Sequence, residues 1–251
     1  MTLVVQSHRS PVPAPWYDTC TSSVRRFARL NGFDYRWLDD ELFDVLPERL
    51  REKTRRQTVV ATDLARLAVL EAAIAEGFER VVWIDADVLV LVPERLSLLD
   101  TGAQFGREVW VQKEPSGRLK VYRRIHNAFM SFRRGDPVLP FYRFAAERIV
   151  DRFVPDDRGM VPQLVGPKLL THLHNAIGFD VLESVGMLSP LVVRDLLSGG
   201  GPALERFAAA SEIAPVAVNV CGSSVASGEL DDDQMQQLVA RLSTGPELLA
   251  V

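Results

Sequence analysis

The chain has 251 residues, of which 47% are hydrophobic and 25% are charged, and its formal net charge is −4. This composition is typical of a globular protein with a large core and excludes a disordered or fibrous chain. The negative balance argues against nucleic acid or an anionic membrane surface as a partner. Two distant cysteines, Cys20 and Cys221, argue against a disulfide scaffold or a zinc site and fit a reducing compartment.

The N-terminus lacks the charged head and long apolar run of a signal peptide. No apolar run approaches the roughly 18 residues that a membrane-spanning helix needs. We therefore expect a cytoplasmic protein without a transmembrane segment.

Predicted strands and helices alternate along the chain. Short apolar or alternating runs predict strands at 3–6, 33–38, 81–91, 109–111, 128–132, 180–183 and 215–220. Helical spacing of apolar residues predicts helices at 16–30, 47–57, 62–76, 137–150, 164–177, 190–197, 202–210 and 231–242. The polar, basic segment 112–126 is predicted to be a connection with a turn at 115–117. The alternation predicts one α/β domain with a mostly parallel sheet.

The run from Val81 to Leu91 is apolar except at Asp85 and Asp87. A run of this kind predicts a central strand covered on both faces. Side chains alternate along a strand, so we expect both carboxylates on one side, with Ala86 on the other. Two adjacent carboxylates repel each other unless a cation lies between them, and their hard oxygen ligands favour Mg²⁺ or Mn²⁺.

The spelling Asp-x-Asp is weak evidence by itself, because Asp231 and Asp233 match it too. Those two open a predicted helix, where negative charge favours the helix dipole, so we interpret them as structural. The first pair differs because it follows a buried strand, and ligands bind at the ends of such strands in open α/β sheets.

A second motif, Thr62-Asp63-Leu64-Ala65-Arg66, lies near the start of the helix that leads into this strand. Asp63 and Arg66 share one helical face. Taken alone they would be read as an exposed ion pair worth about 0.5 kcal/mol or less. Their place before the Asp85–Asp87 strand favours a functional reading.

Together these segments resemble the DXD-containing sugar transferases. That family includes fungal initiating mannosyltransferases, bacterial capsule-type transferases and clostridial glucosylating toxins. Two later segments are similar to its motifs: Asn127-Ala128-Phe129-Met130 with Gly135-Asp136-Pro137, and Gly166-Pro167-Lys168-Leu169-Leu170-Thr171. The match covers about residues 58 to 172, in the family's order. The resemblance implies a single GT-A domain, with residues 1–100 as the nucleotide-binding half and 101–251 as the acceptor side.

The resemblance also implies roles. The activity would be metal-dependent retaining transfer from a UDP- or GDP-sugar to an unknown glycan, lipid-linked or small-molecule acceptor. The residues expected to act on the sugar are Asp63, Arg66, Asp85 and Asn127. The metal, Mn²⁺ or Mg²⁺, would be held by Asp85, Asp87 and Asn219. The donor is expected to contact Gln6, Ser7, His8, Thr62, Asp63, Arg66, Asp85, Ala86, Asp87 and Ser223.

The chain departs from the family pattern in two places. The segment before the strand has Gly77 alone where relatives carry a glycine pair. Near the C-terminus, where many relatives have a histidine ligand and a tryptophan-bearing loop, this chain has Asn219 and Ser223. The C-terminal part of the expected metal site therefore differs from that of the family.

Two other function classes remain open. Haloacid-dehalogenase-type phosphatases also place Asp-x-Asp after an apolar strand, but near the start of the chain. A non-catalytic nucleotide-sugar-binding protein is the other alternative, suggested by the altered C-terminal segment. Phosphate release without an acceptor would identify the phosphatase, and metal-dependent binding without turnover would identify the binder.

Overall fold

A computed structural model describes residues 1–154 and 159–249, and its main feature is a six-stranded sheet in the order β2-β1-β3-β6-β5-β7. Its strands are β1 (Thr2–Ser7), β2 (Asp34–Leu38), β3 (Arg80–Ile84), β5 (Gln104–Lys113), β6 (Leu119–Arg133) and β7 (Asp180–Leu182). β1 is parallel to β2 and β3, and β5 is parallel to β7, whereas β6 is antiparallel to both of its neighbours. Three of the five pairings are therefore parallel.

The strand predicted at 81–91 is in fact two strands in different sheets. β3 ends at Ile84, and β4 (Val88–Val90) joins β9 (Ala217–Asn219) and β8 (Val185–Met187) in a second sheet. The prediction of one continuous strand is wrong, because the two carboxylates occupy a turn in which the Val88 amide donates to the Asp85 carbonyl at 3.0 Å. Strand alternation therefore does not set the directions of Asp85 and Asp87.

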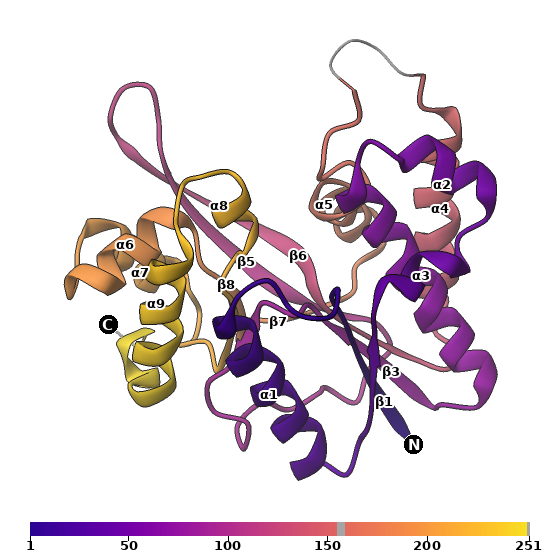
Figure 1. Ribbon diagram of the computed structural model, residues 1–251, viewed down its shortest axis with the longest axis horizontal. Coiled ribbons are helices and arrows are strands. Elements are labelled where there is room, and N and C mark those ends of the chain that lie inside the picture. The colour runs from indigo at the N-terminus through magenta and orange to yellow at the C-terminus, as the bar shows by residue number, and fades with distance from the viewer. Residues whose placement is uncertain (155–158, 250–251) are drawn as a thin grey trace.

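Helices cover both faces of the main sheet (Figure 1). Along β3, Val81 and Trp83 pack on the side of α3, whereas Val82 and Ile84 pack on the side of α1, which is the alternation of a strand buried on both faces. The helices are α1 (Pro15–Leu30), α2 (Glu48–Thr54), α3 (Thr58–Glu76), α4 (Val138–Arg152), α5 (Pro167–Ile177), α6 (Pro190–Ser198), α7 (Pro202–Ala210), α8 (Ser223–Ala226) and α9 (Asp232–Thr244). Two 3-10 helices span Asp40–Val45 and Pro246–Leu249.

The segment predicted as a basic connection at 112–126 instead continues β5 and β6 into a long hairpin that projects from the sheet (Figure 1). Only the turn was predicted correctly: the Gly117 amide donates to the Glu114 carbonyl, and Gly117 has φ +84°. The outer strands form because Val109, Val111 and Val121 bury one face of the hairpin against α6 and α7. Dense charge on the other face hid this alternation in the sequence.

The second Asp-x-Asp pair has the structural role that the sequence predicted. Asp231 is the N-cap of α9, and its carboxylate accepts the Gln234 amide at 2.8 Å. The Gln234 side chain in turn accepts the Asp231 amide at 3.0 Å, which completes a capping box. Asp233 lies exposed in the first turn.

Replacing Asp231 by alanine should therefore lower the free energy of unfolding by about 1 kcal/mol, because the cap is lost. For a chain of this size this corresponds to a melting temperature lower by about 2–4 °C. Asp233→Ala is the matched control, since it removes an aspartate of the same turn without removing the cap. Equal losses in the two variants, measured by thermal unfolding, would contradict the capping role.

Candidate functional site

The centre of the polar cluster is Arg66, which projects from the third turn of α3 and is only 5% exposed. Its guanidinium lies 2.8 Å from an Asp63 oxygen and 3.2 Å from an Asp85 oxygen. It also donates to the Asn127 carbonyl at 2.8 Å and stands over the Trp83 ring, 5.4 Å from its centroid. One buried cation thus joins α3, the end of β3 and β6.

Asp63 is buried beside Arg66 and is held by Asn127, whose side-chain amide donates to one carboxylate oxygen at 2.8 Å. The other oxygen is buried and has no hydrogen-bond partner within the described part of the chain. Burial raises the pKa of Asp63 to about 6, although the Arg66 charge and the Asn127 hydrogen bond oppose the shift. This carboxylate therefore keeps an oxygen available to a polar ligand.

The residue before α5 must be glycine for Asp63 and Asn127 to meet. A Cβ at Gly166 would lie 2.7 Å from the Asp63 oxygen and 3.0 Å from the Asn127 amide nitrogen. Pro167 then begins α5, with no amide hydrogen to satisfy at that position. The Gly166-Pro167 pair thus lets the start of α5 approach the cluster closely.

Asp85 is fixed on both its side chain and its main chain. Its carboxylate accepts the Trp83 indole N–H at 2.5 Å as well as Arg66. Its amide donates to the Ala128 carbonyl at 2.8 Å, and its carbonyl accepts the Gln6 side chain at 3.2 Å. Gln6 is fully buried and also accepts the Tyr35 hydroxyl, so it lies behind the Asp85 turn rather than at an open nucleobase position.

Asp87 faces the second sheet rather than Arg66. Its two oxygens accept the Asn219 side-chain amide at 2.6 Å and the Gly222 main-chain amide at 2.8 Å. Burial, and after it the charge of Asp85, raises the pKa of Asp87. The Asn219 oxygen accepts the amide of Cys221, which has φ +58°. Asn219 therefore shapes the turn that presents the Gly222 amide to Asp87.

A divalent ion needs oxygen ligands, and the carboxylates of this cluster are the candidates. Within residues 1–154 and 159–249, no group of three or more His, Cys, Asp or Glu side chains could hold a metal. Mg²⁺ and Mn²⁺ need less, because they take one or two carboxylates and complete their shell with water and phosphate oxygens. Asp85 and Asp87 supply two carboxylates, and both oxygens of Asp87 already accept hydrogen bonds from the protein. Asn219 could add its oxygen only after its amide turned over, since its NH₂ group now faces Asp87.

The other residues expected to contact the nucleotide-sugar differ in solvent exposure. Thr62 is half-buried and bonds back to the Thr58 carbonyl at 3.0 Å, and Ala86 is buried within the turn. Ser223 is exposed and begins α8 directly after Gly222. Ser7 and His8 are half-buried where β1 ends.

Tyr17 was not among the residues predicted from the sequence. Its side chain lies between His8 and the Asp87 turn. Its ring lies 4.7 Å from the His8 ring, and a Cβ at Gly222 would lie 2.4 Å from the Tyr17 hydroxyl oxygen. Burial raises the pKa of Tyr17, and the nearby Asp87 carboxylate adds to the shift. Trp16 stacks behind it, with ring centroids 3.6 Å apart. The adjacent aromatic residues Trp16 and Tyr17, directly after the proline-rich segment, were the available signal in the sequence.

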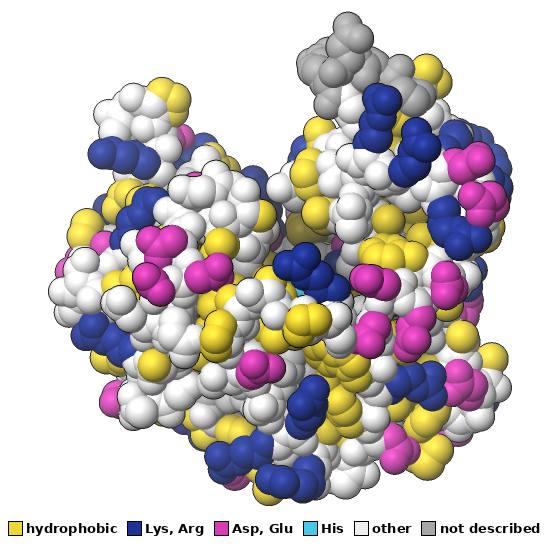
Figure 2. Space-filling model, viewed as in Figure 1, with side chains coloured by type: hydrophobic (Ala, Val, Ile, Leu, Met, Phe, Trp, Pro, Cys, Tyr) yellow, Lys and Arg dark blue, Asp and Glu magenta, His cyan; other side chains and the backbone are white. Residues whose placement is uncertain are grey.

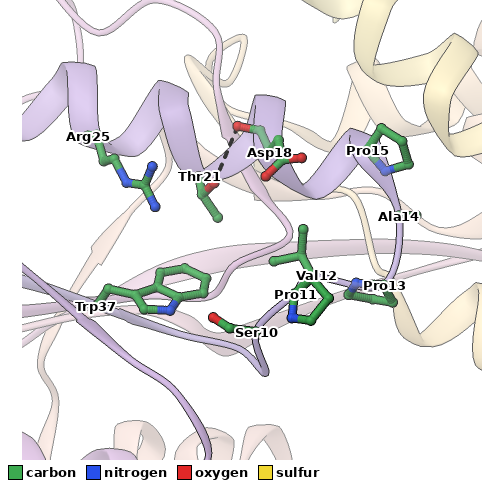
Figure 3. A pocket seen from close by; sticks show the side chains of 10 residues that line it. All are labelled: Ser10, Pro11, Val12, Pro13, Ala14, Pro15, Asp18, Thr21, Arg25 and Trp37. Atoms are coloured by element: carbon green, nitrogen blue, oxygen red, sulfur yellow. Dashed lines mark hydrogen bonds between the residues drawn. The ribbon is translucent and has the colours of Figure 1, made fainter.

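A hollow of about 510 Å³ lies apart from this cluster, between the β1–α1 loop and α1 (Figure 3). The Trp37 ring lies across it from Thr21 and Arg25, with the proline-rich loop at one end (Figure 3). None of its lining residues belongs to the polar cluster. This hollow and the converging charges of the polar cluster are therefore in different places.

Comparison with protein-family models and with curated proteins finds no match. Among solved structures, the chain is similar to a glycosyltransferase involved in the glycosylation of the major capsid of PBCV-1. That likeness has a TM-score of 0.51 and 12% sequence identity, and it covers 94% of this chain and 99% of the other. A second similar structure is the galactosyltransferase LgtC in complex with donor and acceptor sugar analogs, with a TM-score of 0.45, 16% identity and 98% of each chain covered.

The first likeness shows the fold. The chain has the GT-A fold, an α/β architecture with a mostly parallel central sheet, as the sequence predicted. Among the described residues no helix combines the length and the apolar character needed to span a bilayer.

A further carboxylate, Glu108 on β5, is 6% exposed, and its nearest cation is Arg124 at 3.9 Å. Burial raises the pKa of Glu108 from 4.5 to about 7. The folded protein thus holds this proton more tightly than the unfolded chain does. The stability of the protein should therefore fall as the pH rises from about 4.5 through 7.

Replacing Glu108 by glutamine should remove this pH dependence, because glutamine resembles the protonated acid. The variant should gain up to about 3 kcal/mol over the original protein at pH 8 and lose most of this advantage by pH 5. Urea unfolding at the two pH values measures the difference. The control is Glu114→Gln on the same hairpin, where the side chain is half-exposed and little change is expected. An advantage that is the same at both pH values would contradict this account.

Proposed function

We propose that this protein is a metal-dependent, retaining glycosyltransferase that moves a sugar from a nucleotide-diphosphate donor to an acceptor. The observation that carries the proposal is the Arg66 cluster: Asp63, Asp85 and Asn127 converge on one buried guanidinium, next to Asp87, on a GT-A fold. Each of these groups can hydrogen-bond or neutralise part of a nucleotide-sugar.

The donor would lie across the ends of β1 and β3. His8 and Tyr17, half-buried beside the Asp87 turn, would contact the nucleoside of a UDP- or GDP-sugar. The Asp63 oxygen that bonds to none of the described residues would accept a hydroxyl of the transferred sugar, and the Asn127 side chain would contact another. Arg66 would hold these groups in position, since every one of its contacts is already made within the protein.

Asp85 and Asp87 would hold Mn²⁺ or Mg²⁺ together with the donor diphosphate, and Asn219 is the further candidate ligand. When bound, the ion would neutralise negative charge that develops on the leaving diphosphate. The protein's own part is to keep the two carboxylates ionised and near each other. Gly222 and Asn219 do this for Asp87 by donating to its oxygens, which stabilises the charged form.

Retention of configuration is proposed without an enzyme nucleophile. The acceptor oxygen would bond to the anomeric carbon as the bond from that carbon to the phosphate oxygen breaks, on the same face. The acceptor proton would pass to the leaving phosphate. The carboxylates of the cluster then serve to bind and orient, which agrees with their close ties to Arg66, Asn219 and Gly222.

Replacing Asp87 by asparagine should reduce metal-dependent release of nucleotide from the donor by about 100-fold or more, since a charge that acts at the transition state is lost. The melting temperature should fall by no more than about 10 °C, because asparagine has the same size and keeps one of the two acceptor oxygens that bond Asn219 and Gly222. Asp233→Asn, in the second Asp-x-Asp pair, is the matched control and should retain full turnover. Unchanged turnover in Asp87→Asn would reject the assignment.

Donor binding should appear as a metal-dependent rise in melting temperature. With Mn²⁺ and either UDP-glucose or GDP-mannose at about 100 times Kd, the protein should gain about 2.7 kcal/mol, or about 5–10 °C at this chain length. Removal of the metal with a chelator should abolish most of the rise. A rise that survives chelation would contradict the metal requirement.

The same experiments separate the two alternatives. A rise in melting temperature without any nucleotide release would identify a nucleotide-sugar-binding protein. Release of phosphate from a simple phosphate ester, in the absence of an acceptor, would identify a phosphatase.

A further inference from the structure

The β5–β6 hairpin has two faces of different character. Residues opposite each other in an antiparallel pair point to the same side, and alternate residues share a side. Gly106, Glu108 and Trp110 on β5 therefore share one face with their partners His126, Arg124 and Tyr122 on β6. Lys120 continues this face toward the tip. We call the half-exposed and exposed part of it, Trp110, Lys120, Tyr122 and Arg124, the hairpin platform.

The inner end of the platform adjoins the candidate site. β6 runs from Tyr122 and Arg124 through His126 to Asn127, whose side chain points to the other face of the strand and holds Asp63. At about 3.3 Å per residue, Arg124 and Tyr122 lie about 10 and 17 Å from Asn127 along the strand. On the same face, His126 is fully buried against the Val185 carbonyl of β8, at 3.3 Å. β8 pairs with β9, which carries Asn219 beside Asp87.

The platform combines aromatic surface with positive charge. Trp110 and Tyr122 lie opposite each other across the two strands. The Lys120 ammonium is 4.9 Å from the Tyr122 ring centroid, and the Arg124 guanidinium is 4.7 Å from it. Aromatic rings of this kind offer a flat apolar surface with a polar tip, which suits an amphipathic sugar ring.

The two cations of the platform are held less closely by acidic side chains than the two arginines on the opposite face of the hairpin. Lys120 and Arg124 are 49% and 47% exposed, and their acidic neighbours Glu114 and Glu108 lie 3.3 and 3.9 Å away. On the opposite face, Arg107 and Arg123 are tied at 2.6 Å to Glu183 and Glu212 respectively. Of these four cations, Lys120 and Arg124 are therefore the more exposed and the less closely paired. Figure 2 shows basic side chains on the projecting hairpin and a hollow between it and the lobe of α2, α4 and α5.

We propose that the hairpin platform binds the acceptor, and that the acceptor is an acidic saccharide bearing a carboxylate or a phosphate. This inference rests on the proposed glycosyl transfer. The sugar rings would lie on Trp110 and Tyr122, and the acidic group would pair with Lys120 and Arg124. The end of the saccharide that receives the new sugar would then point along β6 past His126, toward the second sheet that carries Asn219 beside Asp87.

The test uses three disaccharides that differ in one group: cellobiose, its 6′-carboxylate and its 6′-phosphate. Binding to the full chain is measured by titration calorimetry in dilute buffer and at raised salt. Each acidic disaccharide should bind about tenfold tighter than cellobiose, because two exposed ion pairs each contribute up to about 1 kcal/mol. The advantage should shrink as salt screens the charges.

Three substitutions locate the binding. Lys120→Gln and Arg124→Gln should each remove much of the preference for the acidic disaccharides, whereas Tyr122→Ala should weaken binding of all three. Arg123→Gln is the matched control: it removes the next arginine along β6, on the opposite face, and should leave all three affinities within about twofold. A stronger effect with the 6′-phosphate than with the 6′-carboxylate, or the reverse, identifies the acidic group.

Equal affinities for the three disaccharides, or no binding of either acidic one, would overturn the inference. So would an Arg123→Gln variant that loses as much affinity as Arg124→Gln. These titrations need no turnover, so their failure leaves the proposed transfer intact. Absence of metal-dependent nucleotide release, with the acidic preference present, would instead reject the transfer and leave a protein that binds acidic saccharides.

Discussion

The burial of Arg66 is the constraint on which the site depends. A guanidinium taken out of water is costly unless its hydrogen bonds and its charge are matched by close partners. Here Asp63, Asp85 and the Asn127 carbonyl supply them, and each comes from a different element. The charge therefore determines where α3, the end of β3 and β6 meet. Gly166 extends the same constraint to α5, since only a residue without a side chain fits against Asp63 and Asn127.

The two carboxylates of the Asp85–Asp87 turn serve different parts of the fold. Asp85 is tied to the main sheet through Arg66 and Trp83, whereas Asp87 is tied to the second sheet through Asn219 and Gly222. A ligand held by both would bridge the two sheets. This division gives a physical reason for the turn, because a continuous strand could not direct the carboxylates to different partners. The hairpin platform adjoins the Asp87 side of this turn, since His126 on the platform face contacts β8, which pairs with the strand of Asn219.

Much of the fold could be predicted from local pattern. The long helices have apolar stripes and clear ends, such as Gly77 in the left-handed conformation after α3. The misreadings came where local pattern and tertiary contact disagree. The apolar run from Val81 to Leu91 continues through the turn because both halves are buried, although in different sheets. The outer β5–β6 hairpin looked like a polar connection because its buried face, with Val109 and Val121, packs on helices more than 60 residues further along the chain.

For the site, the sequence by itself determined which residues are unusual: a carboxylate pair after a buried strand, and an acid and a base one helical turn apart before it. It also separated these from Asp231 and Asp233, whose place at a helix start explains them. Only the tertiary structure decided how they meet. Arg66 is buried and contacts several groups, rather than forming an exposed ion pair with Asp63. Gln6 is buried and donates to the Asp85 carbonyl. Tyr17 lies near Asp87. Some of the contacts in the site join residues far apart in the chain, such as Asp87 and Gly222, which are 135 positions apart. At that separation the burial of a side chain and the direction in which it points depend on tertiary packing, which the local spacing of residues does not encode.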